Sequence, residues 1–193
     1  MIASHDRSGW IGASDVQYVI GNWKTKTWEK WWMTKLGLNR KHFENESTKA
    51  GTNWEHKILD SLHIDGMIKD KQILLPEILL RVNLDGNTQG RIYECKTYKI
   101  GSNAAAKQFE QGMCPPGYRN QVQVQMFASK IYGADIVAYG LEPADYINYL
   151  RGIDPRRLQQ IPVTYDPNWI EKVYLPKHMI LCEALKRRAF PYV

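Results

Sequence analysis

The sequence predicts an α/β fold in which a mixed central sheet is flanked by helices. Segments with strand alternation stand between segments with helical spacing, and this succession favours the mixed class. Ile92, Glu94 and Lys96 alternate with Tyr93 and Cys95, as side chains do on the two faces of a strand. By contrast, the tryptophans of residues 28–32 recur at intervals of three and four, as on one face of a helix. The 193 residues contain no internal repeat, so we expect a single domain over residues 1–193.

Caps and spacing place the helices of the first third of the chain. Ser14 is expected to cap a helix that runs through residues 15–20 and ends at Gly21. A second helix is predicted over residues 23–36, with its tryptophans forming a buried stripe rather than a base-stacking surface. A third helix is predicted over residues 51–62, where Trp54 and Ile58 recur at helical intervals.

The remainder of the chain supplies the predicted sheet and its covering helices. Residues 121–125 read Gln-Val-Gln-Val-Gln, which alternates like a strand, but the flanks are long for a strand, and Val122 and Met126 fit a helical face. We therefore predict a helix over residues 118–131. A short helix is expected over 104–111 and a closing helix over 167–189, broken at Pro176. Strands are predicted at 73–75, 78–82, 91–98, 134–141 and 161–165.

Two neighbouring predicted strands carry the residues with the clearest chemistry. Residues 79–86 end in Asp85-Gly86, a short polar turn follows, and residues 90–96 end in Glu94-Cys95-Lys96. Glu94 and Lys96 share one strand face because side chains repeat every second residue, and Asp85 can reach the same place. Two carboxylates and a lysine that converge in this way are typical of a metal-dependent phosphodiesterase.

Phosphodiester cleavage explains why these residue types are needed together. The reaction requires a hydroxide, stabilisation of an oxyanion and help for the leaving oxygen, and carboxylate-bound Mg²⁺ supplies all three. The lysine either deprotonates or orients the attacking water, or it neutralises charge in the transition state. The sequence leaves both roles open.

The Glu-x-Lys spelling occurs a second time, in Glu55-His56-Lys57. In a helix, residues two apart point to roughly opposite sides (~200° apart), so Glu55 and Lys57 do not converge. The competing interpretation of the first pattern is an exposed hairpin with an ordinary salt bridge.

Four patterns in a fixed order strengthen the nuclease interpretation: residues 11–16, residues 51–55, the Asp-Gly and Glu-x-Lys pair, and residues 118–123. Together they resemble the phage lambda exonuclease family, also called YqaJ-like viral recombinases, within the PD-(D/E)xK nuclease superfamily. The resemblance runs from about residue 7 to about residue 140. It implies a restriction-endonuclease-like form of the α/β fold.

The resemblance also implies roles for single residues. Asp85 and Glu94 would bind the metal, the Cys95 main-chain carbonyl would complete its coordination, and Lys96 would assist the nucleophile. Glu55 would reach the metal from its helix. Gln121 would lie beside the site, and Arg7 with Ser14, seven positions apart, would hold the 5′ phosphate of a DNA end.

The function implied is a Mg²⁺-dependent exonuclease, with Mn²⁺ as a substitute, that enters linear duplex DNA at an end and degrades the 5′-ended strand. The 3′ single strand that it leaves would serve recombination. A phage or prophage origin in a bacterial cytoplasm, a ring-like homo-oligomer and a single-strand annealing partner are further implications. A structure-specific or site-specific endonuclease of the same fold, or a non-catalytic module that binds DNA ends, stays open as an alternative.

Composition agrees with an acidic polymer as partner. The chain has 26 Lys and Arg against 20 Asp and Glu, which gives a net charge of +6. Its three scattered cysteines predict neither a disulfide framework nor an iron–sulfur cluster, and the five histidines lack the spacing of a zinc site. We expect no signal peptide and no membrane-spanning segment, because no apolar run is long enough.

Overall fold

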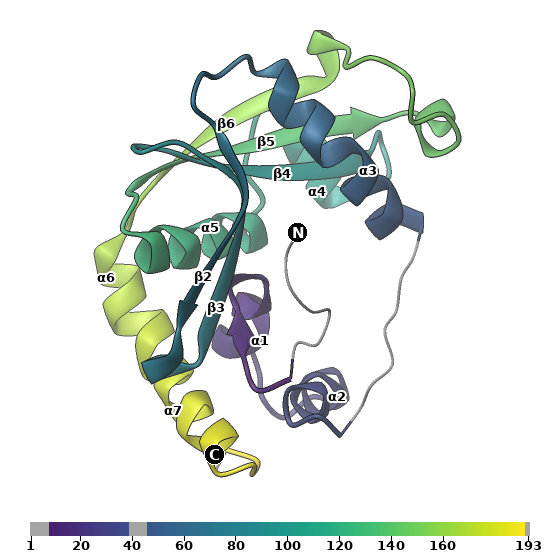
Figure 1. Ribbon diagram of the computed structural model, residues 1–193. Helices are drawn as coiled ribbons and strands as arrows, with labels where there is room; N and C mark the ends of the chain where they lie inside the picture. The colour runs from purple at the N-terminus through teal and green to yellow at the C-terminus, as the bar shows by residue number, and fades with distance from the viewer. Residues whose placement is uncertain (1–7, 39–45, 192–193) are drawn as a thin grey trace.

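A six-stranded mixed sheet with helices on both faces forms the centre of the molecule (Figure 1). The computed structural model describes residues 8–38 and 46–191. Strands β4 and β5 run parallel, as do β1 and β3, and the other pairs are antiparallel. The predicted fold class is therefore confirmed. The strands are β1 (Ile11–Gly12), β2 (Ile68–Leu75), β3 (Leu80–Asn87), β4 (Ile92–Lys99), β5 (Gly133–Leu141) and β6 (Leu158–Thr164).

Strand β3 changes partner along one of its edges. On one side it pairs with β2 from Leu80 to Asn87, with a break at Asp85. On the other side β1 pairs with Leu80 and Arg81, whereas β4 pairs only with Gly86 and Asn87. Between these two contacts, residues 82–85 have no strand partner on this edge within the described chain. Strands β3 and β4 therefore diverge just where Asp85 leaves the paired region, and the divergence leaves a gap between them.

Helices cover the two faces of the sheet with separate apolar clusters. Helix α3 packs Trp54 and Ile58 against Tyr93 and Tyr139 on one face. On the other face, α5, α1, α2 and α7 enclose the larger cluster around Leu84. Strands buried on both faces are mostly apolar, and β5 is apolar apart from Asp135. The helices are α1 (Val16–Ile20), α2 (Lys26–Lys35), α3 (Glu46–Ser61), α4 (Ala104–Glu110), α5 (Pro116–Ser129), α6 (Pro167–Trp169) and α7 (Leu175–Lys186).

The tryptophan stripe of α2 lies against the core, as predicted. Trp28 and Trp32 are buried and stack on each other, with ring centroids 5.5 Å apart. Trp31 is half-buried and stacks on Tyr18 at 4.9 Å. Thr25 caps this helix, because its side chain accepts a hydrogen bond from the Trp28 amide, so α2 begins three residues later than predicted.

Two local predictions were wrong. Ser14 does not cap α1; it lies inside the 3₁₀ turn Ala13–Asp15, and the Asp15 carboxylate instead accepts from the Gly12 amide at 2.7 Å. The closing helix is not broken at Pro176. A π-helical turn, Ile170–Tyr174, precedes α7, and the proline stands in the first turn of α7, where its missing N–H costs little. No helix in the described ranges is both long and apolar enough to cross a membrane.

Candidate active site

A cavity of about 180 Å³ lies at the gap between β3 and β4. Asp85 reaches it from β3, Glu94 and Lys96 from β4, Gln121 from α5, and Ser14 from the turn before α1. Five of the predicted site residues therefore line one cavity. Seven other residues line it, and four of them carry charged or amide side chains that the sequence reasoning did not assign to the site: Asp15, Lys35, Arg81 and Asn83.

The carboxylate of Asp85 bridges the two diverging strands. Its Oδ2 accepts a hydrogen bond from the Cys95 amide at 2.8 Å. This bond connects β3 to β4 where the two strands have no main-chain pairing. The Cys95 side chain lies on the other face of β4, where its thiol is buried and lies 3.8 Å from the Glu55 carbonyl. The main chain of Cys95 thus contacts the site, whereas its side chain packs in the apolar cluster under α3.

Glu94 is only 1% exposed, and donors surround its carboxylate. Its Oε1 accepts from Lys96 Nζ and Gln121 Nε2, and its Oε2 accepts from Gln125 Nε2. A carboxylate is retained at such a depth only when charge-assisted hydrogen bonds offset the loss of its hydration. Three donors from two elements hold Glu94 in one orientation.

The alternating glutamines of α5 are explained by this arrangement. Gln121 and Gln125, four residues apart, lie on the same helical face and both donate to Glu94. Gln123 faces the opposite way, donates to the Thr164 carbonyl and accepts from the Asp166 amide, each at 2.7 Å. The predicted helix is confirmed, and Gln125 is a site neighbour that the sequence signalled only by its spacing from Gln121.

Lys96 is held between an acidic and an aromatic neighbour. Its ammonium donates to Glu94, and it lies 5.4 Å from the centroid of the Tyr118 ring. Burial alone would lower the pKa of Lys96, but the carboxylates of Glu94 and Asp85 outweigh burial and raise the pKa above its ordinary value. In the absence of a metal, Lys96 is therefore a cation at neutral pH.

Burial and acidic neighbours raise the pKa values of Asp85 and Glu55. Burial and the charge of Glu94 raise the pKa of Asp85 well above its usual range. The pKa of Glu55 is raised by burial, then by Glu94 and Asp70. Carboxylates gathered in this way repel one another when ionised, and a cation between them would relieve this repulsion. Their oxygen atoms are hard ligands of the kind that divalent cations prefer. The residues present therefore fit the divalent metal that the sequence resemblance implies.

Glu55 and Lys57 have different neighbours, as their helix requires. Glu55 interacts electrostatically with Glu94 and Lys96, whereas Lys57 donates to the carbonyl oxygens of Tyr149 and Arg151. Glu55 is not among the residues that line the cavity. Ligand atoms of Glu55, His56 and Asp70 lie within 4.8 Å of one another and form a second cluster. Glu55 connects this cluster electrostatically to Glu94 and Lys96, and His56 and Asp70 were not foreseen from the sequence.

The predicted phosphate pair is placed only in part. Ser14 lines the cavity, but Arg7 lies outside the described residues. Next to Ser14, Asp15 accepts from the ammonium of Lys35 at 2.5 Å and from the indole of Trp31 at 2.9 Å. Lys35 is 3% exposed, so an ion pair with little access to solvent stiffens this wall of the cavity.

Solved structures with this fold are similar to the chain along most of its length. An exonuclease in complex with dAMP, LHK-Exo, is 19% identical with a TM-score of 0.71, over 94% of this chain and 90% of that one. The alkaline exonuclease LHK-Exo from Laribacter hongkongensis is 21% identical over 94% of each chain, with a TM-score of 0.65. A phage-related exonuclease from Haemophilus somnus 129PT is 16% identical over 91% and 92%, with a TM-score of 0.66.

A search of the curated proteins gives no match. The family comparison is decisive, because residues 4–131 match the YqaJ-like viral recombinase domain. This match spans every element that lines the cavity between β3 and β4. The chain belongs to the YqaJ-like viral recombinase family.

Proposed function

We propose that this protein is a metal-dependent exonuclease that degrades the 5′-ended strand of linear duplex DNA and leaves 3′ single strand for recombination. One observation carries the proposal: Asp85, Glu94, Lys96, Gln121 and Ser14 line a single cavity where two strands diverge. The three similar structures are named as exonucleases and support the reaction class.

In this proposal Asp85 and Glu94 would hold Mg²⁺, or Mn²⁺ in its place, with the Cys95 carbonyl as a further oxygen ligand and Glu55 reaching the cation directly or through a water. A cation bound there would supply an acidified water and stabilisation of the charge on the phosphate. Gln121 and Gln125 keep the Glu94 carboxylate turned toward the cavity. Lys96 stabilises the developing negative charge, and it takes a proton from water only if its pKa falls once the carboxylates are neutralised.

Glu55 and Lys57 offer a matched pair for testing the metal site. We expect Glu55→Gln to slow cleavage by roughly 10- to 100-fold, the range for residues that support a metal. Lys57→Ala should leave the rate near that of the wild type and lower the melting temperature instead, because Lys57 anchors the main chain of residues 149–151. Single-turnover rates and thermal melts of both variants provide the measurement. Equal loss of cleavage in the two variants would contradict the assignment of Glu55.

The choice of DNA end tests the exonuclease itself. A linear duplex with a 5′ phosphate should be degraded faster than one with a 5′ hydroxyl, and a covalently closed circle should resist. By the family resemblance, Arg7 would supply a forked guanidinium to the terminal phosphate, and Ser14 lines the cavity. Arg7→Ala is therefore expected to erase the difference between the two ends. The measurement is digestion of end-labelled duplexes with Mg²⁺, with a chelator as the blank.

Two results of that experiment would redirect the proposal. Closed circles cut as fast as linear DNA would indicate an endonuclease of the same fold. Binding of DNA ends without metal-dependent cleavage would indicate a non-catalytic module. A ring-like homo-oligomer and an annealing partner belong to the proposal through the family alone.

A further inference from the structure

A second pocket, of about 670 Å³, lies next to the proposed active site. The strand that carries Lys96 continues into this pocket as Thr97, Tyr98 and Lys99. Tyr118 lines the pocket, and its ring lies 5.4 Å from the Lys96 ammonium, which lines the first cavity. A polymer threaded past Lys96 would therefore enter this pocket next.

Aromatic rings dominate one wall of the pocket. Tyr98 stacks on Phe109 at 5.3 Å, and Phe109 stacks on Tyr118 at 5.5 Å with planes 17° apart. Phe109 is buried in the middle of this column, while both tyrosines are partly exposed. Tyr146 adds a fourth ring to the lining. Partly exposed rings of this kind are the surfaces on which unpaired bases stack, whatever their sequence.

The rest of the lining suits the sugar–phosphate part of a nucleotide. Lys99 is exposed and lines the pocket, so it can pair with a phosphate. Ser102 and Asn103 add a hydroxyl and an amide. The volume lies within the range of pockets that bind small molecules, and it is large enough for one nucleotide.

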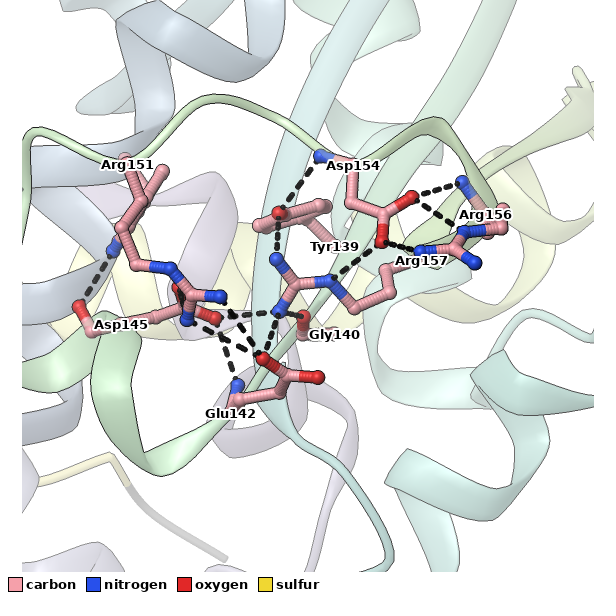
Figure 2. Close-up of polar contacts among 9 residues, drawn as sticks. Tyr139, Gly140, Glu142, Asp145, Arg151, Asp154, Arg156 and Arg157 are labelled. Atoms are coloured by element: carbon pink, nitrogen blue, oxygen red, sulfur yellow. Dashed lines mark hydrogen bonds and ion pairs between the residues drawn. The ribbon is translucent and has the colours of Figure 1, made fainter.

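A network of charges around the buried Asp145, the residue before Tyr146, holds this segment in place (Figure 2). The fully buried carboxylate of Asp145 accepts from Arg151 at 2.8 Å and from Arg157 at 2.6 Å. Arg157 also donates to the Tyr139 hydroxyl at 2.6 Å, and the Asp145 carbonyl accepts from the Trp54 indole at 3.0 Å. Burial tends to raise the pKa of Asp145, but the Glu142 amide and the two arginines lower it overall. The pocket is therefore built before a ligand arrives, which reduces the entropy lost on binding.

We propose that this pocket holds the unpaired nucleotide on the 3′ side of the scissile phosphate, in the strand being degraded. Its base stacks against the tyrosines and its phosphate pairs with Lys99. The inference rests on the proposed function. If the 5′ phosphate lies beside Ser14 and the scissile phosphate lies at Asp85, the next nucleotide of the same strand lies on the side of Lys96 and Tyr118. The duplex must then be opened by at least that nucleotide before cleavage.

Abasic substitution tests the pocket one position at a time. Linear duplexes with a 5′ phosphate carry one abasic residue, either at the second nucleotide of the 5′-ended strand or opposite it in the complementary strand. Release of the first nucleotide is measured in single turnover for the wild type, Tyr146→Ala and Tyr146→Phe. Tyr132→Ala is the matched control, because Tyr132 is 55% exposed and stacks on Tyr165 at the start of β5, away from the pocket.

The abasic residue in the cut strand should slow the wild type roughly tenfold, which corresponds to the loss of one stacked base. Tyr146→Ala should slow cleavage of intact DNA by a similar factor, and the two changes together should cost no more than either alone. Tyr146→Phe and Tyr132→Ala should behave like the wild type. The inference would be overturned if the rate reductions caused by the abasic residue and by Tyr146→Ala multiplied when combined. It would also be overturned if only the abasic residue in the complementary strand slowed cleavage.

Binding separates this inference from the proposed function. The same variants and DNAs are compared by fluorescence anisotropy in a chelator, where cleavage does not occur. If the abasic residue and Tyr146→Ala together raise the dissociation constant no more than either change alone, the result supports binding of the nucleotide in this pocket. If they raise it by the product of the two effects, the inference fails even when cleavage is normal. Failure to release nucleotides from intact duplex refutes the exonuclease, while the binding comparison still decides the pocket.

Discussion

Asp85→Asn is expected to abolish cleavage while leaving the protein folded and able to bind DNA. The loss should exceed the roughly 10- to 100-fold that removal of an outer partner of a metal ligand costs, because a ligand charge itself is removed. An asparagine can still accept the Cys95 amide through its carbonyl oxygen, so the bridge between β3 and β4 survives. Initial rates on linear duplex and circular dichroism spectra check the two halves of this prediction.

Glu94→Gln should abolish cleavage as well, but this substitution disturbs the local structure in addition to removing the charge. Both oxygens of Glu94 accept from donors, so an amide would turn its NH₂ group against one of them. A matched control is Asp135→Asn, which changes a buried carboxylate that accepts from Arg91 and Gln160 and lies outside the cavity lining. Full activity in Asp85→Asn or Glu94→Gln would refute the assignment of the metal ligands.

The second large effect is expected at Lys96. Lys96→Ala should lower kcat by a factor of roughly 10² or more, the usual cost of losing proton transfer or charge stabilisation. Lys96→Arg separates the two roles, because arginine keeps the positive charge but does not lose its proton. Substantial activity in Lys96→Arg would indicate charge stabilisation, and activity as low as in Lys96→Ala would indicate proton transfer.

Saturation curves for both variants provide the measurement, with Lys186→Ala as an exposed control on α7. The raised pKa of Lys96 leads us to expect the first outcome. A change confined to KM would mean that Lys96 only holds the substrate, and it would contradict both roles.

Local patterns were sufficient for most of the fold and for the convergence of Asp85, Glu94 and Lys96. Strand alternation places Glu94 and Lys96 on one face, and a short turn returns the chain beside Asp85. The divergence of β3 and β4 was not predictable, since it depends on β1, which is distant in sequence and pairs with only two residues of β3. Pairing register of this kind follows from tertiary packing rather than from any local signal.

The lining residues contributed by distant elements were missed for the same reason. Lys35 lies in α2, where a lysine at the end of a helix is expected to face solvent, yet its ion pair with Asp15 draws it inward. The segment between β5 and β6 shows no regular periodicity, so the buried Asp145 with its two arginines gave no pattern to recognise.

The contacts of Gln125 make the ordering of the Glu94 carboxylate a late step in folding. Its amide donates to Glu94, 31 residues away, and to the Asn83 carbonyl, 42 residues away. Contacts of such sequence separation form only after loop closure has been overcome, so Glu94 reaches its final orientation when α5 docks on the diverging strands. Local opening of α5 would disorder the carboxylate while both strands remain folded. The persistence of the catalytic geometry is therefore set by the docking of one helix rather than by the global stability of the sheet.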